Sequence, residues 1–205
     1  MPYRNRGGGS LYAEALKAVT RLTLETAPPS KAAVAEYLGA QEGELAAMFD
    51  SDRQMLQATL ASSISLLNDR CIRMVVEVDP NDPIAQTIAL ADAYLGWAHD
   101  NPREFTIIGM LPVAETTSDE TLLRYENALH DLMLRLFRDA QAKGLLSPDQ
   151  DLPLLVATVR CFAFGTAAKM ISGNLARWTG QESHLEAARR ALHEFVRQVL
   201  IPRAA

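Results

Sequence analysis

Apolar residues recur at helical spacing along almost the whole chain, and no segment shows the strict alternation of a half-buried β-strand. The longest stripe, from Leu56 to Met74, predicts one helix of about seven turns that begins at a cap on Ser51. Shorter stripes predict further helices on both sides of it. About nine helices are expected, at residues 11 to before Pro28, 31–38, 42–48, 51 to the break at 79–83, 83–100, 102–111, 118–143, 148–173 and 183–200.

Proline, glycine and small polar residues mark the expected helix ends. Ser30 follows Pro28-Pro29 as an N-cap, and Gly39 ends the short helix that Ser30 begins. Ser147-Pro148, together with Gln150, is expected to open the next-to-last helix through a cap, a proline at the first position and a capping box. The chain is therefore predicted to be all-α.

The composition is that of an ordinary globular protein, with 205 residues of which 48% are hydrophobic and 22% charged. The formal net charge is −5, so the overall charge does not favour nucleic acid or an anionic membrane as a partner. Any DNA-binding role has to be argued from local features. The cysteines, Cys71 and Cys161, have no second cysteine nearby and are predicted to be reduced and structural.

Two segments bear on localisation. The first ten residues lack the apolar core of a secretory signal. The most membrane-like stretch, Leu154 to Ile171, is interrupted by Arg160 and Lys169. We expect a buried or interface helix there, no membrane partner, and a cytoplasmic protein.

Two short helices joined by the turn at Gly39, with one longer helix before them, match the arrangement of a helix-turn-helix DNA reader. A recognition helix of about two turns is enough to place its first residues in the major groove while its neighbours hold it there. A helix–glycine–helix corner is also a common packing unit. The local pattern leaves both interpretations open.

The order of residues favours the DNA reader. The stretch Val34 to Gln41 (Val-Ala-Glu-Tyr-Leu-Gly-Ala-Gln), followed by Leu45, Phe49, Ser51, Met55 and Leu56, resembles the DNA-binding domain of TetR-family transcriptional regulators. Farther on, Tyr94 to Phe105 is similar to part of one common C-terminal domain of that family, and Phe164-Gly165 falls where that domain often has a His-Gly pair. The resemblance implies a helix-turn-helix domain, here residues 1–50, joined to a larger helical ligand-binding and dimerisation domain, here residues 51–205.

The resemblance also implies where DNA is contacted: at the start of the second helix, in the recognition helix and at the start of the long helix. The residues concerned are Ser30, Lys31, Gln41, Glu42, Gly43, Glu44, Ala47, Met48 and Arg53. Two positions depart from the family, which usually has a backbone-contacting tyrosine where Ala46 stands and a lysine where Asp52 stands. Residues 1–56 carry six basic side chains against seven acidic ones. Because phosphate neutralisation supplies most non-specific affinity, we expect weak or strongly salt-sensitive DNA binding.

The family's C-terminal helices bind a small effector and form a dimer, and the resemblance implies the same here. A mixed apolar set with His130 and Arg160 as polar anchors is the candidate cavity lining: Met74, Trp97, Phe105, Met110, Tyr125, His130, Met133, Arg160, Cys161 and Phe164. Each can equally be ordinary core, and Arg160 an outward-facing or salt-bridged arginine. The expected dimer seam consists of Leu155, Val159, Phe162, Thr166, Leu192, Phe195, Val199 and Leu200.

Catalysis has little support, because the four histidines lack metal-ligand spacing and no phosphate loop or nucleophile elbow is present. We expect no enzyme, no metal and no cofactor. The prediction is a homodimeric one-component transcriptional regulator, most often a repressor in this family, which binds operator DNA and is released by a small-molecule effector. The alternative is a ligand-binding or interaction module of the same fold whose DNA binding is weakened or lost.

Overall fold

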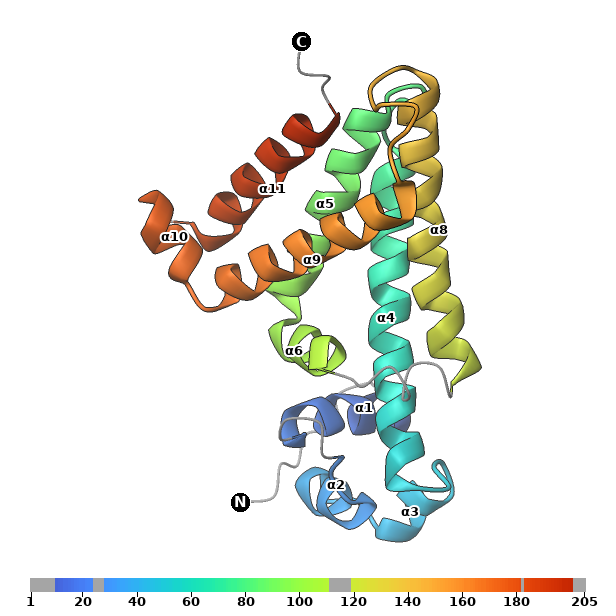
Figure 1. Ribbon diagram of the computed structural model, residues 1–205. Helices are drawn as coiled ribbons and strands as arrows, with labels where there is room; N and C mark the ends of the chain where they lie inside the picture. The colour runs from blue at the N-terminus through green and yellow to red at the C-terminus, as the bar shows by residue number, and fades with distance from the viewer. Residues whose placement is uncertain (1–9, 24–27, 111–118, 182, 201–205) are drawn as a thin grey trace. The chain divides into compact units, whose positions relative to one another are not determined.

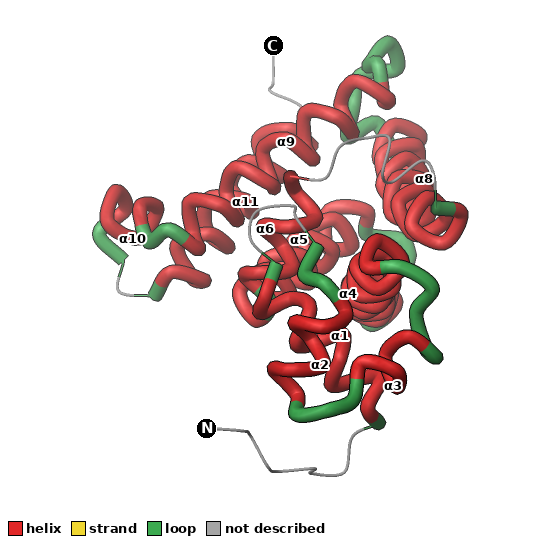
Figure 2. Tube along the Cα trace, turned by 90° about the horizontal axis from the view of Figure 1, so that it is seen from below, coloured by secondary structure: helices red, strands yellow, loops and turns green. Residues whose placement is uncertain are grey.

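The computed structural model describes residues 10–23, 28–110, 119–181 and 183–200. Within those ranges it contains ten α-helices and no strand, which confirms the all-α prediction (Figures 1 and 2). By internal contacts the chain divides into two compact units. Unit 1 is Met1–Ile64 with Arg103–Leu123, and unit 2 is Ser65–Pro102 with Arg124–Ala205.

Unit 1 is built around a small three-helix core. Its helices are α1 (Leu11–Leu22), α2 (Lys31–Leu38), α3 (Glu42–Ala46), the first half of α4 (Asp52–Val76) and α6 (Pro102–Met110). α1 packs against α2, and α2 against α3. Val19, Val34 and Leu45 have no exposed surface. These short helices are therefore held by a shared apolar core.

The helix boundaries in unit 1 follow their capping residues. Ser30 Oγ accepts the Ala33 N–H at 3.1 Å, and Gly39 ends α2 in the left-handed region with φ 64°. A residue with a Cβ is strained there, which is why glycine suits this turn. α3 ends at Ala46, two residues before the predicted end, because Met48 N–H turns back to the Leu45 carbonyl at 3.1 Å.

Unit 2 is a larger helical assembly. It comprises the second half of α4, α5 (Pro83–Asp100), α8 (Glu120–Ala142) from Arg124 onward, α9 (Leu152–Ile171), α10 (Asn174–Thr179) and α11 (His184–Leu200). α11 packs mainly against α5 and α9, and α10 packs against α9 and α11 (Figure 1). One of its cores contains Phe137, Val156, Val196 and Leu200.

Two predictions about unit 2 were wrong in detail. α9 begins at Leu152 and not at residue 148, because the Asp151 carboxylate accepts the Leu154 N–H at 3.0 Å and caps the helix. The Ser147–Gln150 segment forms a turn instead. The helix α10 was not predicted, since it is only six residues long. Gly173 and Gly180 bound it, both with positive φ.

The predicted stripe on α4 is confirmed from Leu56 to Cys71, but at its end Val75 is buried where Met74 was expected, and Met74 is half-buried. The residues that are buried on it recur every three or four positions: Leu56, Leu60, Ile64, Leu67, Cys71 and Val75. α4 thus contributes apolar surface to the cores of both units. Burying one stripe in this way is what stabilises an amphipathic helix.

Neighbouring leucines on α4 allow a matched test of this core. Leu67 is 6% exposed and Leu66 is 59% exposed. Leu67→Ala is expected to lower the free energy of unfolding by about 2–5 kcal/mol, because it leaves a cavity. Leu66→Ala removes the same atoms from a solvated position and is expected to change it by about 0.5 kcal/mol or less. Urea denaturation followed by circular dichroism measures both. Equal losses in the two variants would contradict the burial pattern.

Candidate functional site

The first candidate site is the exposed surface of α3. Of the five residues of α3, only Leu45 is buried, and Glu42, Gly43, Glu44 and Ala46 are exposed. Leu45 anchors the helix in the core of unit 1 while the rest of α3 faces solvent. A helix that buries one side chain and exposes the others can present them to an external surface.

Asp52 links the start of α4 to the start of α2. Its carboxylate accepts the Lys31 backbone N–H at 2.8 Å, so the first residue of α4 satisfies an amide in the first turn of α2. The Lys31 ammonium donates to the carbonyls of Phe49 and Asp50, each at 3.1 Å. Lys31 was predicted to contact DNA; in this structure two of the three N–H groups of its ammonium bond to the turn between α3 and α4.

The acidic residues of α3 have different surroundings. Glu44 Oε2 accepts the Gln41 N–H at 2.9 Å and so satisfies a backbone donor at the start of the helix. Glu42 is exposed, and no hydrogen bond or ion pair of its side chain is found among the described residues. Of these two carboxylates, the Glu42 carboxylate is therefore the more available for an outside partner.

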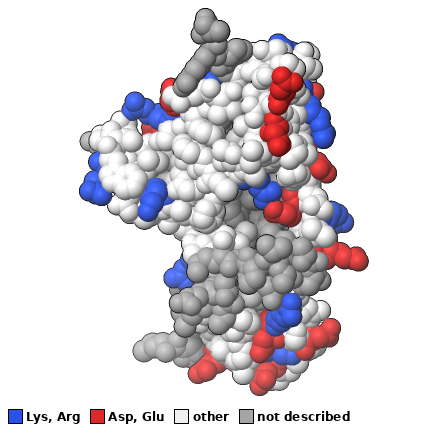
Figure 3. All heavy atoms as spheres, in the orientation of Figure 1, with Lys and Arg blue, Asp and Glu red and all other residues white. Residues whose placement is uncertain are grey.

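The remaining predicted DNA residues lie around α3 in unit 1. Ser30 is exposed and occupied as the cap of α2. Gln41, Ala47 and Arg53 are exposed, and Met48 is half-buried. Figure 3 shows acidic and basic side chains interspersed on the face it draws, without a large field of one sign. This agrees with the near balance of charge counted from the sequence.

The second candidate site lies in the interior of unit 2. Asn68 on α4 and Trp97 on α5 are each 3% exposed. Asn68 Nδ2 donates to the Tyr125 carbonyl of α8 at 3.2 Å, but Asn68 Oδ1 and Trp97 Nε1 have no hydrogen-bond partner among the residues that the structure describes. An unsatisfied buried polar atom costs about 1–3 kcal/mol, so both atoms are poised to bond with an added group.

Ionisable groups surround this interior. Burial raises the pKa of the Cys71 thiol to about 12, and the nearby Arg70 charge offsets this only in part. Burial likewise raises the pKa of Tyr94, against a smaller opposing effect of Arg160. Arg160 pairs with Glu126, so of the interpretations left open for this arginine the structure has the salt-bridged one. Cys71 and Tyr94 therefore remain neutral at physiological pH.

The other predicted ligand residues are scattered. Met74, His130 and Met133 are half-buried, and Met133 packs against the core cluster that contains Phe137. Phe105 is buried in unit 1, while Cys161 and Phe164 are exposed on α9. The side chain of Met110 lies outside what the structure describes. Asn68 was missed by the sequence reasoning, although a polar residue directly after Leu67 in an apolar stripe is a usable signal.

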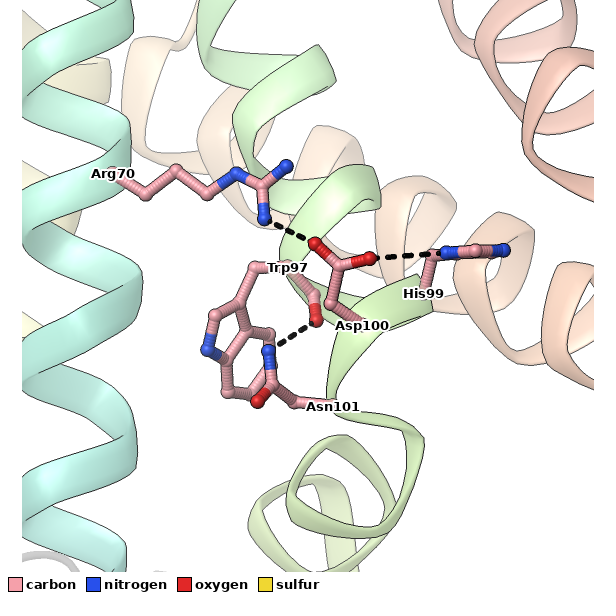
Figure 4. A network of polar contacts seen from close by, with 5 residues as sticks. All are labelled: Arg70, Trp97, His99, Asp100 and Asn101. Atoms are coloured by element: carbon pink, nitrogen blue, oxygen red, sulfur yellow. Dashed lines mark hydrogen bonds and ion pairs between the residues drawn. The ribbon is translucent and has the colours of Figure 1, made fainter. Parts of the chain in front are cut away.

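A third polar network lies at the end of α5 in unit 2 (Figure 4). Arg70 Nη1 on α4 bonds to Asp100 Oδ2 at 2.7 Å, and His99 Nδ1 lies 3.2 Å from Asp100 Oδ1. Gly96 leaves room for the guanidinium, because a Cβ there would lie 2.9 Å from Arg70 Cζ. Asn101 Nδ2 donates to the Trp97 carbonyl at 2.9 Å. The network fixes the end of α5 against α4 beside Trp97.

The C-terminal part of the chain matches a protein-family model described as the tetracyclin repressor-like C-terminal domain, over residues 87–195. The match covers more than half of the sequence. The chain belongs to the TetR family of transcriptional regulators. Members of this family are normally not enzymes; they bind DNA and small ligands as dimers. A comparison with curated protein sequences finds no match.

Solved structures support the TetR fold over almost the whole chain. A protein of unknown function from Rhodococcus sp. RHA1 is 23% identical, with a TM-score of 0.72, and 98% of this chain and 99% of that chain are covered. The fatty acid degradation regulator FadR from Bacillus halodurans is 13% identical, with a TM-score of 0.71 and coverage of 93% and 96%. A Saccharomonospora viridis protein solved with choline is 17% identical, with a TM-score of 0.68 and coverage of 94% and 96%.

The predicted dimer seam of this TetR-family chain lies only partly at the surface. Leu155, Val159, Thr166, Leu192 and Leu200 are buried within the single chain. Phe162 is 38% exposed, and Phe195 and Val199 are half-buried. The rings of Phe162 on α9 and Phe195 on α11 stack with centroids 4.1 Å apart. The buried members support the chain's own core, so a partner has only the outer members to contact.

The Asp100 network predicts a pH-dependent contribution to stability. The Arg70 hydrogen bond, and then the His99 one, lower the pKa of Asp100 below its ordinary value. The ionised carboxylate therefore stabilises the folded chain above an unfolded pKa of about 3.9, and this is lost as the pH falls through the lower folded pKa. Because Asp100 is largely exposed, Asp100→Asn is expected to lower the melting temperature only slightly near neutral pH.

The melting-temperature gap between Asp100→Asn and the wild type is expected to begin closing below about pH 4, the unfolded pKa, and to vanish below the lowered folded pKa, where the wild-type carboxylate is protonated too. Differential scanning calorimetry across this range measures it. Asp131→Asn on α8 removes an exposed carboxylate with no ion pair among the described residues, and should leave no such pH-dependent gap. A gap for Asp100→Asn that is constant with pH would contradict the role assigned to the charge.

Proposed function

We propose that this chain is a homodimeric, cytoplasmic one-component repressor that reads operator DNA with α3 and is released by a small effector bound in unit 2. The observation that carries the proposal is the exposed α3, anchored by Leu45 alone and held between capped neighbours. A short helix that exposes all but one of its side chains has little reason to be kept rigid unless its outer face meets a partner. Membership of the TetR family supports DNA as that partner.

We call α2, α3 and the first turn of α4 the reading head. Its polar side chains suggest how it binds DNA. Two of the three N–H groups of the Lys31 ammonium bond to carbonyls, and Asp52 is an anion, which repels phosphates. Glu42 remains exposed and is suited to accept a hydrogen bond from the N4 amino group of cytosine. Affinity then depends more on base contacts than on charge neutralisation. Because few phosphates are contacted, we expect the affinity for unrelated DNA to be low.

Fluorescence anisotropy tests this with DNA from upstream of the chain's own gene and an unrelated duplex of equal length. We expect the cognate duplex to bind at least about a hundred-fold more tightly at near-physiological salt, since specific sites usually exceed non-specific ones by more than that. Glu42→Gln is expected to weaken the cognate complex by about ten-fold and to relax the preference at one base pair. No preference between the duplexes at low or high salt would contradict the DNA-reading proposal.

The alternative is that the fold is kept and DNA recognition is lost, which the acidic α3 and the partly bonded Lys31 ammonium favour. Ala46→Tyr separates the two readings, because Ala46 is exposed and the family usually has a backbone-contacting tyrosine there. A large gain in affinity for any duplex favours a degraded head, and a loss of cognate binding favours an adapted one. Ala128→Tyr, at an exposed position of α8, is the control. Asp52→Lys is unsuitable, since it removes the bond to the start of α2.

The effector site is supported by two of the three buried polar atoms that have no hydrogen-bond partner among the described residues of unit 2; the third, Arg189 Nε, lies 3.5 Å from Asp92 Oδ1. Trp97 Nε1 can only donate and Asn68 Oδ1 can only accept, so an effector would offer an acceptor to the first or a donor to the second. α4 is one continuous helix from Asp52 to Val76, so a shift at Asn68 is passed along it toward the reading head. The ligand then favours the arrangement in which the two heads no longer match their half-sites.

The homodimer is supported by the outer face of α9. Ten positions of α9 are exposed, and Lys169 is the only charged one among them. Leu154 is 62% exposed, Phe164 39% and Ile171 36%. By length and composition α9 is also the one described helix that qualifies as a membrane span, a test that core helices pass as well. A contiguous apolar face of this kind marks an interface, and we propose that a second copy covers it.

Leu154→Glu tests the dimer. The side chain is so exposed in the single chain that its replacement should change the free energy of unfolding of the monomer by about 0.5 kcal/mol or less. Two carboxylates brought to an apolar two-fold interface should instead disrupt association. Size-exclusion chromatography with light scattering is expected to give a dimer for the wild type and for Ala128→Glu, and a monomer for Leu154→Glu. A monomeric wild type at micromolar concentration would contradict the proposal.

A further inference from the structure

Two buried polar atoms of unit 2 without a hydrogen-bond partner among the described residues, Trp97 Nε1 and Asn68 Oδ1, lie at the same level of the fold. α4 and α5 run in opposite directions (Figure 1), and Arg70 sets their register, since its guanidinium bonds to Asp100 and lies against Gly96. Asn68, two residues before Arg70, is therefore level with the part of α5 that carries Trp97. In Figure 4 the nitrogen-bearing edge of the Trp97 ring is turned toward α4. Both atoms thus belong to one region of the α4–α5 interface.

Helices α8 and α9 border the same region. Asn68 Nδ2 donates at 3.2 Å to the carbonyl of the α8 residue that precedes Glu126, and Glu126 pairs with Arg160 of α9. Burial raises the pKa of Tyr94 on α5, and the charge of Arg160 is the largest influence after burial. Tyr94 lies three positions before Trp97 and so on the same side of α5. Arg160 therefore brings a cation to the region that contains Trp97.

This region needs an added acceptor more than an added donor. The indole N–H is the only polar group of the Trp97 ring and can only donate, whereas the Asn68 amide already makes one bond through Nδ2. The Arg160 guanidinium has five N–H groups, and among the described residues it bonds only to Glu126. Trp97 and Arg160 can therefore both donate to a group that enters.

The Arg160–Glu126 pair indicates which acceptor fits. A guanidinium fork matches the paired oxygens of a carboxylate, and Glu126 supplies a carboxylate at this position already. The side chains of Arg160 and Glu126 are each 39% exposed, so a ligand can reach Arg160 and the displaced Glu126 can turn to water. Trp97 is only 3% exposed, so the rest of such a ligand leaves water for the core and has to be apolar.

We propose that the effector of unit 2 is a small organic carboxylate that takes the place of Glu126 on Arg160 and accepts the Trp97 N–H. This inference rests on the effector site proposed above and names the chemical class that the site selects. Arg160 is then the residue that determines specificity. Glu126 is a resident competitor, which a ligand has to displace.

Six-carbon probes that differ in their polar group test this class: hexanoate, 1-hexanol and hexylammonium. Isothermal titration calorimetry on the full chain, at neutral pH and low salt, measures their affinities. We expect hexanoate to bind at one site per chain and about ten-fold or more tightly than the other two, because only hexanoate brings an anion to Arg160. Trp178→Phe replaces an exposed tryptophan and leaves Trp97 as the only one. Hexanoate is expected to shift the fluorescence of Trp97 in this variant.

Two variants of the ion pair are expected to change the hexanoate affinity in opposite directions. Arg160→Gln should weaken it about ten-fold or more, since the charged donor is lost. Glu126→Gln breaks the same ion pair but should tighten binding about three-fold, since the competing carboxylate is gone. Arg138→Gln and Asp131→Asn remove the same charges from exposed positions of α8 that have no ion pair among the described residues. Both controls are expected to leave the affinity within about two-fold.

The inference is wrong if hexanoate does not bind, or binds no more tightly than 1-hexanol. Tighter binding of hexylammonium would overturn it as well, and would assign the site to cations through Glu126. An equal loss in Arg160→Gln and Arg138→Gln would indicate general electrostatic attraction instead. Release of DNA is measured separately by anisotropy. Hexanoate binding that depends on Arg160 but leaves the DNA complex intact would support the carboxylate site and contradict effector-controlled release.

Discussion

The fold depends on one requirement, that α4 buries an apolar stripe along its whole length. Leu56 and Leu60 fill the core of unit 1, and Leu67, Cys71 and Val75 that of unit 2. Both cores use the same continuous helix, which runs from Asp52 to Val76. Asp52 stands at its first turn and holds the start of α2.

In the head, charged residues stabilise helix ends where a DNA-binding protein usually directs such groups outward. Asp52 satisfies an amide of α2, Lys31 two carbonyls of the α3–α4 turn, and Glu44 an amide at the start of α3. A head held by its own charges is rigid but offers few cations to a phosphate backbone. This accounts physically for the weak electrostatic component expected of its DNA binding.

In the interior of unit 2, by contrast, buried polar groups lower the stability of the fold. Asn68 and Trp97 keep unsatisfied polar atoms in a core that would be more stable without them, and Cys71 and Tyr94 stay neutral through burial. Such a local deficit is expected where a ligand completes the bonding. The outer face of α9 is also unfavourable in the single chain, because its apolar side chains are exposed to water. These are the features at which we propose an effector and a second copy of the chain.

The sequence by itself determined most of the helices, because their apolar period and their capping residues are local properties; Ser30, Gly39 and most of the α4 stripe could be identified in advance, but the short α10 could not. It also indicated the TetR family. Only the tertiary structure decided what individual polar side chains do. The sequence does not distinguish Asp52 from a polar residue that faces DNA. Its role as the partner of the Lys31 amide becomes visible only because α2 lies beside the start of α4. The inward and outward faces of α9 were likewise undecided, since an apolar helix has no polar side to mark its orientation; packing against α5 and α11 buried Leu155 and Val159 and left Leu154 outside.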